Sequence, residues 1–269
     1  MSDFTVDRDS TKRVLGSAGT LVSYGTDEPA FEFNADGSYK GLLVEPAATN
    51  EIRNNTMVGA VAGTPGTLPT NWAEALSGLT REVVGIGVEN GVDYIDIRLY
   101  GTATDTTSTI RFESQTQIVA ADGETWTVSA WVKSISETDP PTQYSLGMFE
   151  RTAAGALVIS SATAITPSAT LTRSSYTNTL SGGGTVERVQ PAFVFGLVNG
   201  NTYDFTIRIG WPQMEKGAIA TSAITTTGSA AVIRAKDDII LTSASSLIGQ
   251  TAGTLYVEVD YKIVKSGTR

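Results

Sequence analysis

An Asn-Gly pair between two runs of strand-forming residues is the feature that most constrains the fold of this chain. Residues 79–87 and 92–100 flank Asn90 and Gly91, and side-chain types alternate along 92–100. Asn-Gly favours a tight turn in which both central residues have positive φ, which is the commonest connection of a two-stranded hairpin. The sequence therefore predicts an antiparallel hairpin here.

Further strand candidates recur every ~8–14 residues after this hairpin, a spacing typical of antiparallel sandwiches and jelly rolls. The turns between them are rich in Gly, Asn and Pro, and no long segment has an apolar period of 3.6 residues. We predict an all-β fold, an antiparallel jelly-roll β-sandwich with an N-terminal arm and a C-terminal strand extension. Alternation assigns these residues to its core: Val128, Val132, Phe193, Phe195, Phe205, Ile207 and Ile209.

The chain of 269 residues is divided by composition into three segments. We expect the sandwich over residues 51–220 and a C-terminal linker and strand over 221–269. Residues 1–50 contain only small apolar clusters, Phe31 with Phe33 and residues 42–44, which are too few to fold alone. We interpret 1–50 as an arm that attaches the sandwich to another subunit or to another protein.

Composition excludes several function classes. The chain has no histidine and no cysteine, so disulfides, thiolate or imidazole metal sites and Ser-His-Asp catalysis are ruled out. A net charge of −9 without clustered Lys and Arg argues against a nucleic-acid partner. No apolar run approaches the ~20 residues of a bilayer span, and no secretory signal is visible, so we expect no membrane insertion.

Two motifs at opposite ends of the chain resemble a known family. Residues 31–37 read FEFNADG and residues 41–50 read GLLVEPAATN, while residues 212–237 read PQMEKGAIATSAITTTGSAAVIRAKD. In this order they resemble a family of bacteriophage and prophage structural proteins, of tail-fibre or tail-associated type, whose sandwich is similar to carbohydrate-binding modules. The resemblance covers most of the chain, and the family is defined by architecture rather than by chemistry.

The resemblance implies a non-enzymatic virion structural protein, assembled in the cytoplasm of the bacterial host. Its partners would be other virion proteins and, through the sandwich, host cell-surface polysaccharide. Two alternatives remain open: a purely architectural capsid fibre, decoration or collar protein, and a fragment of a tail spike that depolymerises polysaccharide. The last would need two carboxylates paired across a cleft, and the strands offer Glu82, Asp93, Asp96, Glu113, Glu150, Glu187 and Asp204.

Aromatic residues are the candidates for glycan contact, because sugar-binding sandwiches stack Trp and Tyr rings on pyranose rings. Trp131 lies on the polar side of its strand, with Ser129 and Lys133, whereas Trp126 alternates with apolar residues and is assigned to the core. The other candidates lie at strand ends or where a loop meets a strand. The predicted glycan contacts are Trp131, Trp72, Tyr100 and Tyr144.

The C-terminal segment predicts an oligomer contact. Five residues alternate with polar ones, as in a half-buried strand, and such a strand needs a partner for its apolar face and backbone edges: Leu255, Val257, Val259, Tyr261 and Ile263. By analogy with phage fibres we expect a homotrimer. No cofactor is expected, and similarity to carbohydrate-binding modules implies that any bound ion would be calcium near residues 51–71 or at a sandwich edge.

Overall fold

A computed structural model describes residues 4–241 and 258–260, and all regular structure in these residues is β-strand. The chain divides into two compact units. Unit 2 is Thr49–Ile233, and unit 1 combines the described residues of Met1–Ala48 and Arg234–Arg269. The short strands β6 (Ala48–Asn50) and β18 (Val232–Arg234) pair with each other.

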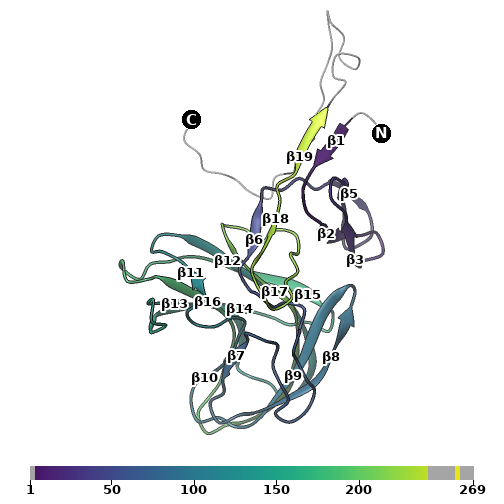
Figure 1. The fold of residues 1–269 in the computed structure, drawn as a ribbon. Coiled ribbons are helices and arrows are strands. Elements are labelled where there is room, and N and C mark those ends of the chain that lie inside the picture. The colour runs from purple at the N-terminus through teal and green to yellow at the C-terminus, as the bar shows by residue number, and fades with distance from the viewer. Residues whose placement is uncertain (1–3, 242–257, 261–269) are drawn as a thin grey trace, which may run out of the picture. The chain divides into compact units, whose positions relative to one another are not determined.

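Unit 2 consists of two antiparallel sheets (Figure 1). The five-stranded sheet has the order β15 (Thr172–Thr179), β12 (Thr125–Asp139), β17 (Thr202–Lys216), β9 (Val92–Thr102) and β8 (Thr80–Glu89). The six-stranded sheet has the order β14 (Leu157–Ile165), β13 (Gln143–Arg151), β16 (Arg188–Gly196), β10 (Thr107–Arg111) and β7 (Ala73–Ala75), and β11 (Ile118–Val119) also pairs with β16.

The path of the chain through these sheets is that of a jelly roll. From β9 it passes to β10 in the other sheet, back to β12, across to the hairpin β13–β14, and then through β15, β16 and β17 in alternate sheets. The strand orders β15-β12-β17-β9 and β14-β13-β16-β10 are those produced by two interleaved Greek keys. The predicted all-β jelly-roll sandwich is confirmed.

The predicted Asn-Gly hairpin is the β8–β9 connection. Asn90 has φ 53° and Gly91 has φ 82°, so both central residues are left-handed, as the turn requires. The pairing of Glu89 with Val92 closes the hairpin. The residue types over 109–120 predict one continuous strand, but in the structure β10 ends at Arg111 and pairing resumes at Ile118–Val119.

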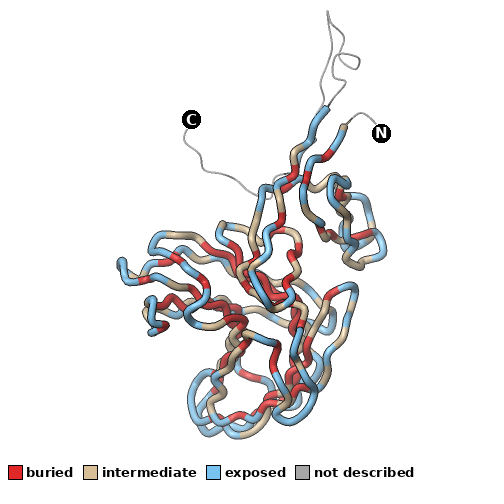
Figure 2. The backbone as a smooth tube through the Cα atoms, viewed as in Figure 1, coloured by how far each residue is buried: buried red, intermediate tan, exposed pale blue. Residues whose placement is uncertain are grey.

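Alternation along the strands places the apolar residues between the two sheets. The core residues predicted from the sequence are all buried, and Trp126 lies with them. Figure 2 shows buried segments running along the strands of the sandwich and exposed segments at its turns. Burial of this apolar surface is the main source of stability for unit 2.

Buried asparagines of unit 2 bind the segment that follows β17. Asn50 donates from Nδ2 to the carbonyl of Ile224 at 3.0 Å and accepts from the backbone N–H of Met214 at 3.0 Å. Asn55 likewise donates to Ile224 and accepts from the N–H of Thr226. The end of the GLLVEPAATN motif is thus bonded directly to the second motif, which closes the sandwich.

Unit 1 contains β1 (Phe4–Asp7), which pairs with β19 (Asp238–Leu241), and two hairpins. The hairpins are β2 (Lys12–Leu15) with β3 (Leu21–Tyr24) and β4 (Phe31–Phe33) with β5 (Tyr39–Leu42). Pairing of β1 with β19 joins residues that are far apart in the sequence, since Phe4 opposes Leu241. The N-terminal segment is therefore completed by residues that follow unit 2.

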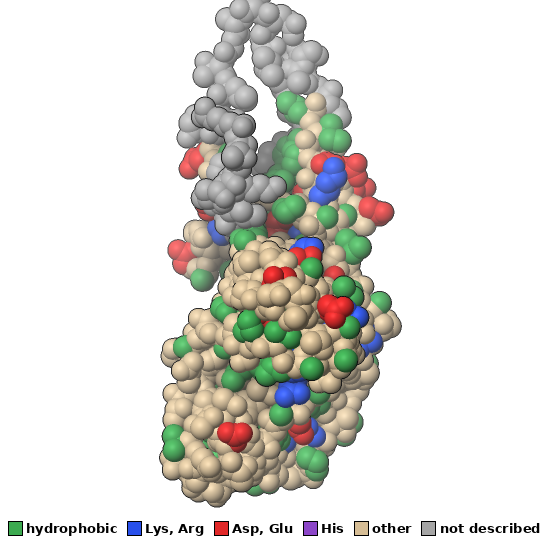
Figure 3. Space-filling view, turned by 90° about the vertical axis from the view of Figure 1, so that its left-hand side faces the viewer, with side chains coloured by type: hydrophobic (Ala, Val, Ile, Leu, Met, Phe, Trp, Pro, Cys, Tyr) green, Lys and Arg blue, Asp and Glu red, His purple; other side chains and the backbone are tan. Residues whose placement is uncertain are grey.

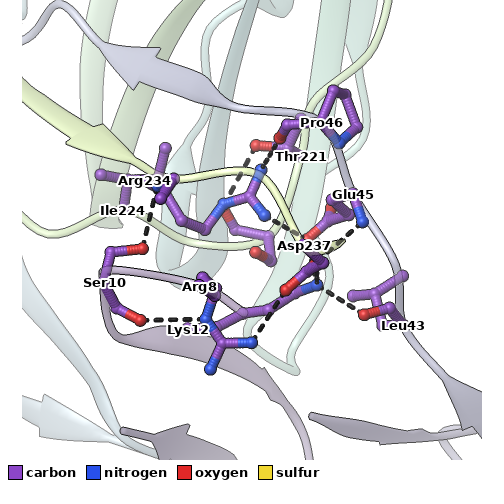
Figure 4. A network of polar contacts seen from close by, with 12 residues as sticks. Arg8, Ser10, Lys12, Leu43, Glu45, Pro46, Thr221, Ile224, Arg234 and Asp237 are labelled. Atoms are coloured by element: carbon purple, nitrogen blue, oxygen red, sulfur yellow. Dashed lines mark hydrogen bonds and ion pairs between the residues drawn. The ribbon is translucent and has the colours of Figure 1, made fainter. Parts of the chain in front are cut away.

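A buried network of ion pairs stabilises unit 1 (Figure 4). The carboxylate of Asp237 accepts from Arg8 at 2.8 Å and from Lys12 at 2.5 Å, and both cations are almost fully buried. Glu45 pairs with Lys12 at 3.1 Å and with Arg234 at 2.8 Å. Both motifs contribute residues to this network: the first contributes Glu45, and the second contributes Arg234 and Asp237. Unit 1 therefore also joins the two motifs.

Acidification is expected to loosen unit 1 through Asp237. Burial alone would raise the pKa of Asp237, but hydrogen bonds from Lys12 and Arg8 outweigh it and hold that pKa below its ordinary value. The stability that this carboxylate contributes is therefore present above its unfolded pKa of about 3.9 and is lost as the pH falls through the lower folded pKa.

Hydrogen exchange can measure this loss, because the backbone N–H of Glu45 donates to the same carboxylate at 2.8 Å. The protection factor of the Glu45 amide should fall as the pH drops from about 5 to about 2. A protection factor that stays constant over this range would show that Asp237 does not govern the unit.

Candidate binding face of the sandwich

The four aromatic residues predicted to contact glycans fall into two groups. Trp72 and Tyr144 are buried core residues. Trp72 packs edge-on against Phe112 and donates from Nε1 to a backbone carbonyl, and Tyr144 packs against Phe205 with ring centres 5.9 Å apart. A ring enclosed by the core cannot stack on a sugar, so the structure assigns these two residues to packing, which corrects the sequence-based interpretation.

Trp131 and Tyr100 lie on the outward side of the five-stranded sheet, here called the five-stranded face. The register aligns Trp131 with Gly210 and Gly210 with Tyr94, so two aromatic rings flank a glycine. Three rings of this face each have a guanidinium over them, with distances from the guanidinium carbon to the ring centre of 4.5 Å for Arg173 on Trp131, 3.3 Å for Arg208 on Tyr94 and 4.6 Å for Arg98 on Tyr100.

The charges of the five-stranded face neutralise one another. Arg208 forms two hydrogen bonds with Asp96, at 2.8 and 2.7 Å, and contacts Glu89. Arg98 is paired in the same way with Asp204 and also with Glu82. The bonds to these carboxylates raise the pKa of both arginines. Donors and acceptors are therefore matched here without any ligand.

The outward side of the six-stranded sheet, here called the six-stranded face, differs in this respect. Its central residues alternate with the core residues Ile110 and Met148, which are fully buried. These central residues are Thr109 and Arg111 on β10, Phe149 and Arg151 on β13, and Gln190 on β16. Phe149 opposes Gln190 in the register, and Arg111 opposes Ala192.

Two arginines gather around one aromatic ring on the six-stranded face. The guanidinium carbons of Arg111 and Arg151 lie 5.7 and 5.4 Å from the ring centre of Phe149. Arg151 is held by the side-chain oxygen of Gln190 at 2.9 Å and by the carbonyl of Gly155 at 2.9 Å. Neither arginine forms a salt bridge with any carboxylate in the described part of the chain.

Several donors of this face have no acceptor within the described residues. Arg111 Nε and Thr109 Oγ1 are buried and make no hydrogen bond. Burial lowers the pKa of Arg111, and burial together with the charge of Arg111 lowers that of Arg151. A buried donor without a partner costs about 1–3 kcal/mol. The six-stranded face therefore contains polar groups that are incompletely satisfied, unlike the five-stranded face.

Small side chains surround these groups. In the register, Ala162 opposes Gly147, Gly147 opposes Ala192, and Ala192 opposes Arg111. The row itself contains nothing larger than a methyl group, whereas the ring of Phe149 is buried beneath the two guanidinium groups. On the face of the sandwich that Figure 3 shows, the side chains of Lys, Arg, Asp and Glu are few.

The carboxylates considered for hydrolysis are engaged elsewhere. Glu113 is fully buried and pairs with Arg53 at 2.7 Å, and Glu150 accepts from the backbone N–H of Ser181 at 3.0 Å. The others bind as follows: Glu82 and Asp204 with Arg98, Asp96 with Arg208, Asp93 with Trp211, and Glu187 with the N–H of Ala153. Among the described residues no group of three or more Asp and Glu could hold a metal ion.

The sequence contains a signal for the six-stranded face that our aromatic criteria missed. Along β13 the core positions are Tyr144, Leu146 and Met148, so Phe149 falls out of phase with them and on the polar side. An aromatic out of phase with the core, with Arg151 two residues later, marks an outward site. That Arg111 lies beside the same ring could not be predicted from the sequence, because Arg111 is 40 residues before Arg151 and on a different strand.

The predicted oligomer contact lies largely outside the described residues. This applies to Leu255, Val257, Tyr261 and Ile263. Val259 is described and is exposed, and residues 258–260 form no strand. The homotrimer stays a prediction.

Comparison with known proteins yields no matching family model and no match among curated proteins. Solved structures give distant similarity. A CBM4 protein is 18% identical with a TM-score of 0.39, over 62% of this chain and 99% of the other. The tripod from the baseplate of bacteriophage Tuc2009 is 14% identical with a TM-score of 0.43, over 88% of this chain and 74% of the other.

A third similar structure is the enzymatically active domain of bacteriophage CBA120 tailspike protein 4. It is 14% identical with a TM-score of 0.34, over 55% of this chain and 19% of the other. Separately, no helix among the described residues is long and apolar enough to cross a membrane.

Proposed function

We propose that this protein is a non-enzymatic bacteriophage virion protein, of tail-fibre or tail-associated type, that binds host-surface glycans through the six-stranded face. The observation that carries the glycan role is the guanidinium of Arg111 beside Phe149, whose Nη groups make no hydrogen bond within the described residues and are not enclosed. A polyhydroxylated or anionic ligand would supply acceptors for these Nη groups.

The virion role rests on the two sequence motifs. Within unit 2 they are joined through Asn50, and within unit 1 through Glu45 and Arg234. The contacts between the motifs thus stabilise each unit, as expected of an architectural protein. Fold alone does not specify function, so the glycan role depends on the six-stranded face and not on the jelly roll.

We propose in addition that the protein is not a glycosidase. A glycosidase needs an accessible carboxyl with a raised pKa near a second carboxylate. Burial raises the pKa of Glu215, but this side chain is enclosed and accepts from the N–H of Thr221 at 3.0 Å. We assign Glu215 to the structure of the second motif.

A blocking substitution tests the proposed face. Ala162 on β14 and Ser175 on β15 are exposed positions on edge strands of opposite sheets, and each faces outward. On an array of host polysaccharides, the Ala162→Trp variant should lose at least about tenfold in affinity, equivalent to about 1.4 kcal/mol. The matched Ser175→Trp variant should bind as the unaltered protein does.

Each other outcome favours a different function. Loss in Ser175→Trp with retention in Ala162→Trp would move the site to the five-stranded face, where Trp131 and Tyr100 lie. No binding to any glycan would favour the architectural capsid fibre, decoration or collar protein. Release of new reducing ends from the polysaccharides would identify the depolymerase.

A further inference from the structure

Arg111 and Arg151 differ from six other described arginines, each of which forms a salt bridge with Asp or Glu: Arg8, Arg53, Arg81, Arg98, Arg208 and Arg234. Acidic residues outnumber basic ones, 28 to 19, so carboxylates are plentiful. In the described chain no carboxylate pairs with Arg111 or Arg151, so these two neighbouring positive charges have no counter-charge.

The atoms left without partners are suited to a planar anion. The Nη atoms of Arg111 and Nη2 of Arg151 make no hydrogen bond within the described residues, and none of them is among the fully enclosed polar atoms. A guanidinium presents parallel donors that match the two oxygens of a carboxylate. Gln190 and Gly155 fix the direction of the Arg151 guanidinium, so this part of the site is preorganised.

We infer that the six-stranded face selects glycans bearing a carboxylate, as in uronic or sialic acids, through Arg111 and Arg151. This inference rests on the proposed glycan-binding function. The carboxylate would lie between the two guanidinium groups, and the sugar ring would lie over the row of Gly147, Ala162 and Ala192. A bound carboxylate would also relieve the electrostatic repulsion between the two guanidinium groups, and this relief adds to the affinity for an anion.

Paired oligosaccharides that differ only in the charged group test the selectivity by calorimetry. An oligogalacturonate is compared with the same oligomer after reduction of its carboxyl groups, and sialyllactose is compared with lactose. In at least one pair the acidic member should bind at least about tenfold more tightly, and its affinity should fall as salt is added. Inorganic phosphate is a third arm that measures simple anion binding.

Arg111→Gln is the central variant, because Arg111 has no polar partner whose loss would disturb the fold. It should abolish the preference for the acidic member and leave the melting temperature within about 2 °C. Arg111→Lys keeps the charge but loses the fork of donors, so it should retain only part of the preference. Arg98→Gln is the control, since this arginine is paired on the opposite face.

The results separate this inference from the proposed function. Equal affinity for acidic and neutral members, abolished by Ala162→Trp, would overturn the carboxylate preference and keep the glycan function. Binding of phosphate as tight as that of the acidic sugars would reduce the site to a general anion site and overturn the inference. Binding of no glycan, on the array or in solution, would overturn both.

Discussion

Replacing Asp237 by alanine is expected to lower the free energy of unfolding of unit 1 by about 3–5 kcal/mol. Asp237 neutralises Arg8 and Lys12, which are buried to 1% and 0% exposure, and accepts from the backbone N–H of Glu45. Without it, the charges in this cluster would be three cations and one carboxylate, all out of water. An uncompensated buried charge costs far more than the ion pair contributes.

The neighbouring residue supplies a matched control. Among the described residues Asp238 forms one ion pair, with Lys236, and the side chains of Asp238 and Lys236 are 45% and 65% exposed. Asp238→Ala should lower the free energy of unfolding of unit 1 by less than about 1 kcal/mol, because surface ion pairs contribute little. Protection of amides in β2 and β3 against hydrogen exchange measures the stability of unit 1 in both variants. Equal losses in the two would mean that the buried network does not hold the unit together.

Much of the sandwich could be predicted because its information is local. Alternation along 125–135 and 203–211 assigns Val128 and Phe205 to the core, and both are fully buried. Asn90 and Gly91 fix a turn through their own backbone preferences. These signals need no knowledge of distant residues.

Other boundaries depended on distant partners. The sequence pattern predicts that residues 136–141 break the strand, but β12 continues to Asp139 because it pairs with β17, where Asp139 opposes Asp204. Conversely, the strand expected over 109–120 stops at Arg111, and the buried Glu113 turns to bind Arg53. In both cases the tertiary partner overrides the local pattern.

The candidate site was harder to predict than the fold for the same reason. Aromatic type alone selected Trp72 and Tyr144, whose hydrogen bonds to the backbone of Asn54 and to Glu137 satisfy their polar atoms at the border of the core. What marks the six-stranded face is the lack of a partner for Arg111, and a missing partner is visible only in three dimensions. Sequence alternation could identify Phe149 as outward, but not the arginine above it.

Replacing Phe205 by alanine is expected to lower the free energy of unfolding of unit 2 by about 3–5 kcal/mol, the usual cost of removing a buried aromatic ring. Phe205 is fully buried in β17, with its ring centre 5.3 Å from that of Phe195 and 5.9 Å from that of Tyr144. Since these neighbours come from the opposite sheet, the cavity would open between the two sheets and could not close by a local shift.

Urea unfolding followed by tryptophan fluorescence measures this effect on unit 2 alone, since all 4 tryptophans, residues 72, 126, 131 and 211, lie within Thr49–Ile233. Tyr100→Ala is the matched control, because this ring lies on the neighbouring strand β9 but faces outward under Arg98. Removing the Tyr100 ring should lower the free energy of unfolding of unit 2 by about 1 kcal/mol, the energy of a cation–π contact. Equal midpoints for the two variants would contradict the register in which Phe205 points between the sheets, and with it the assignment of Arg111 and Phe149 to an outward face.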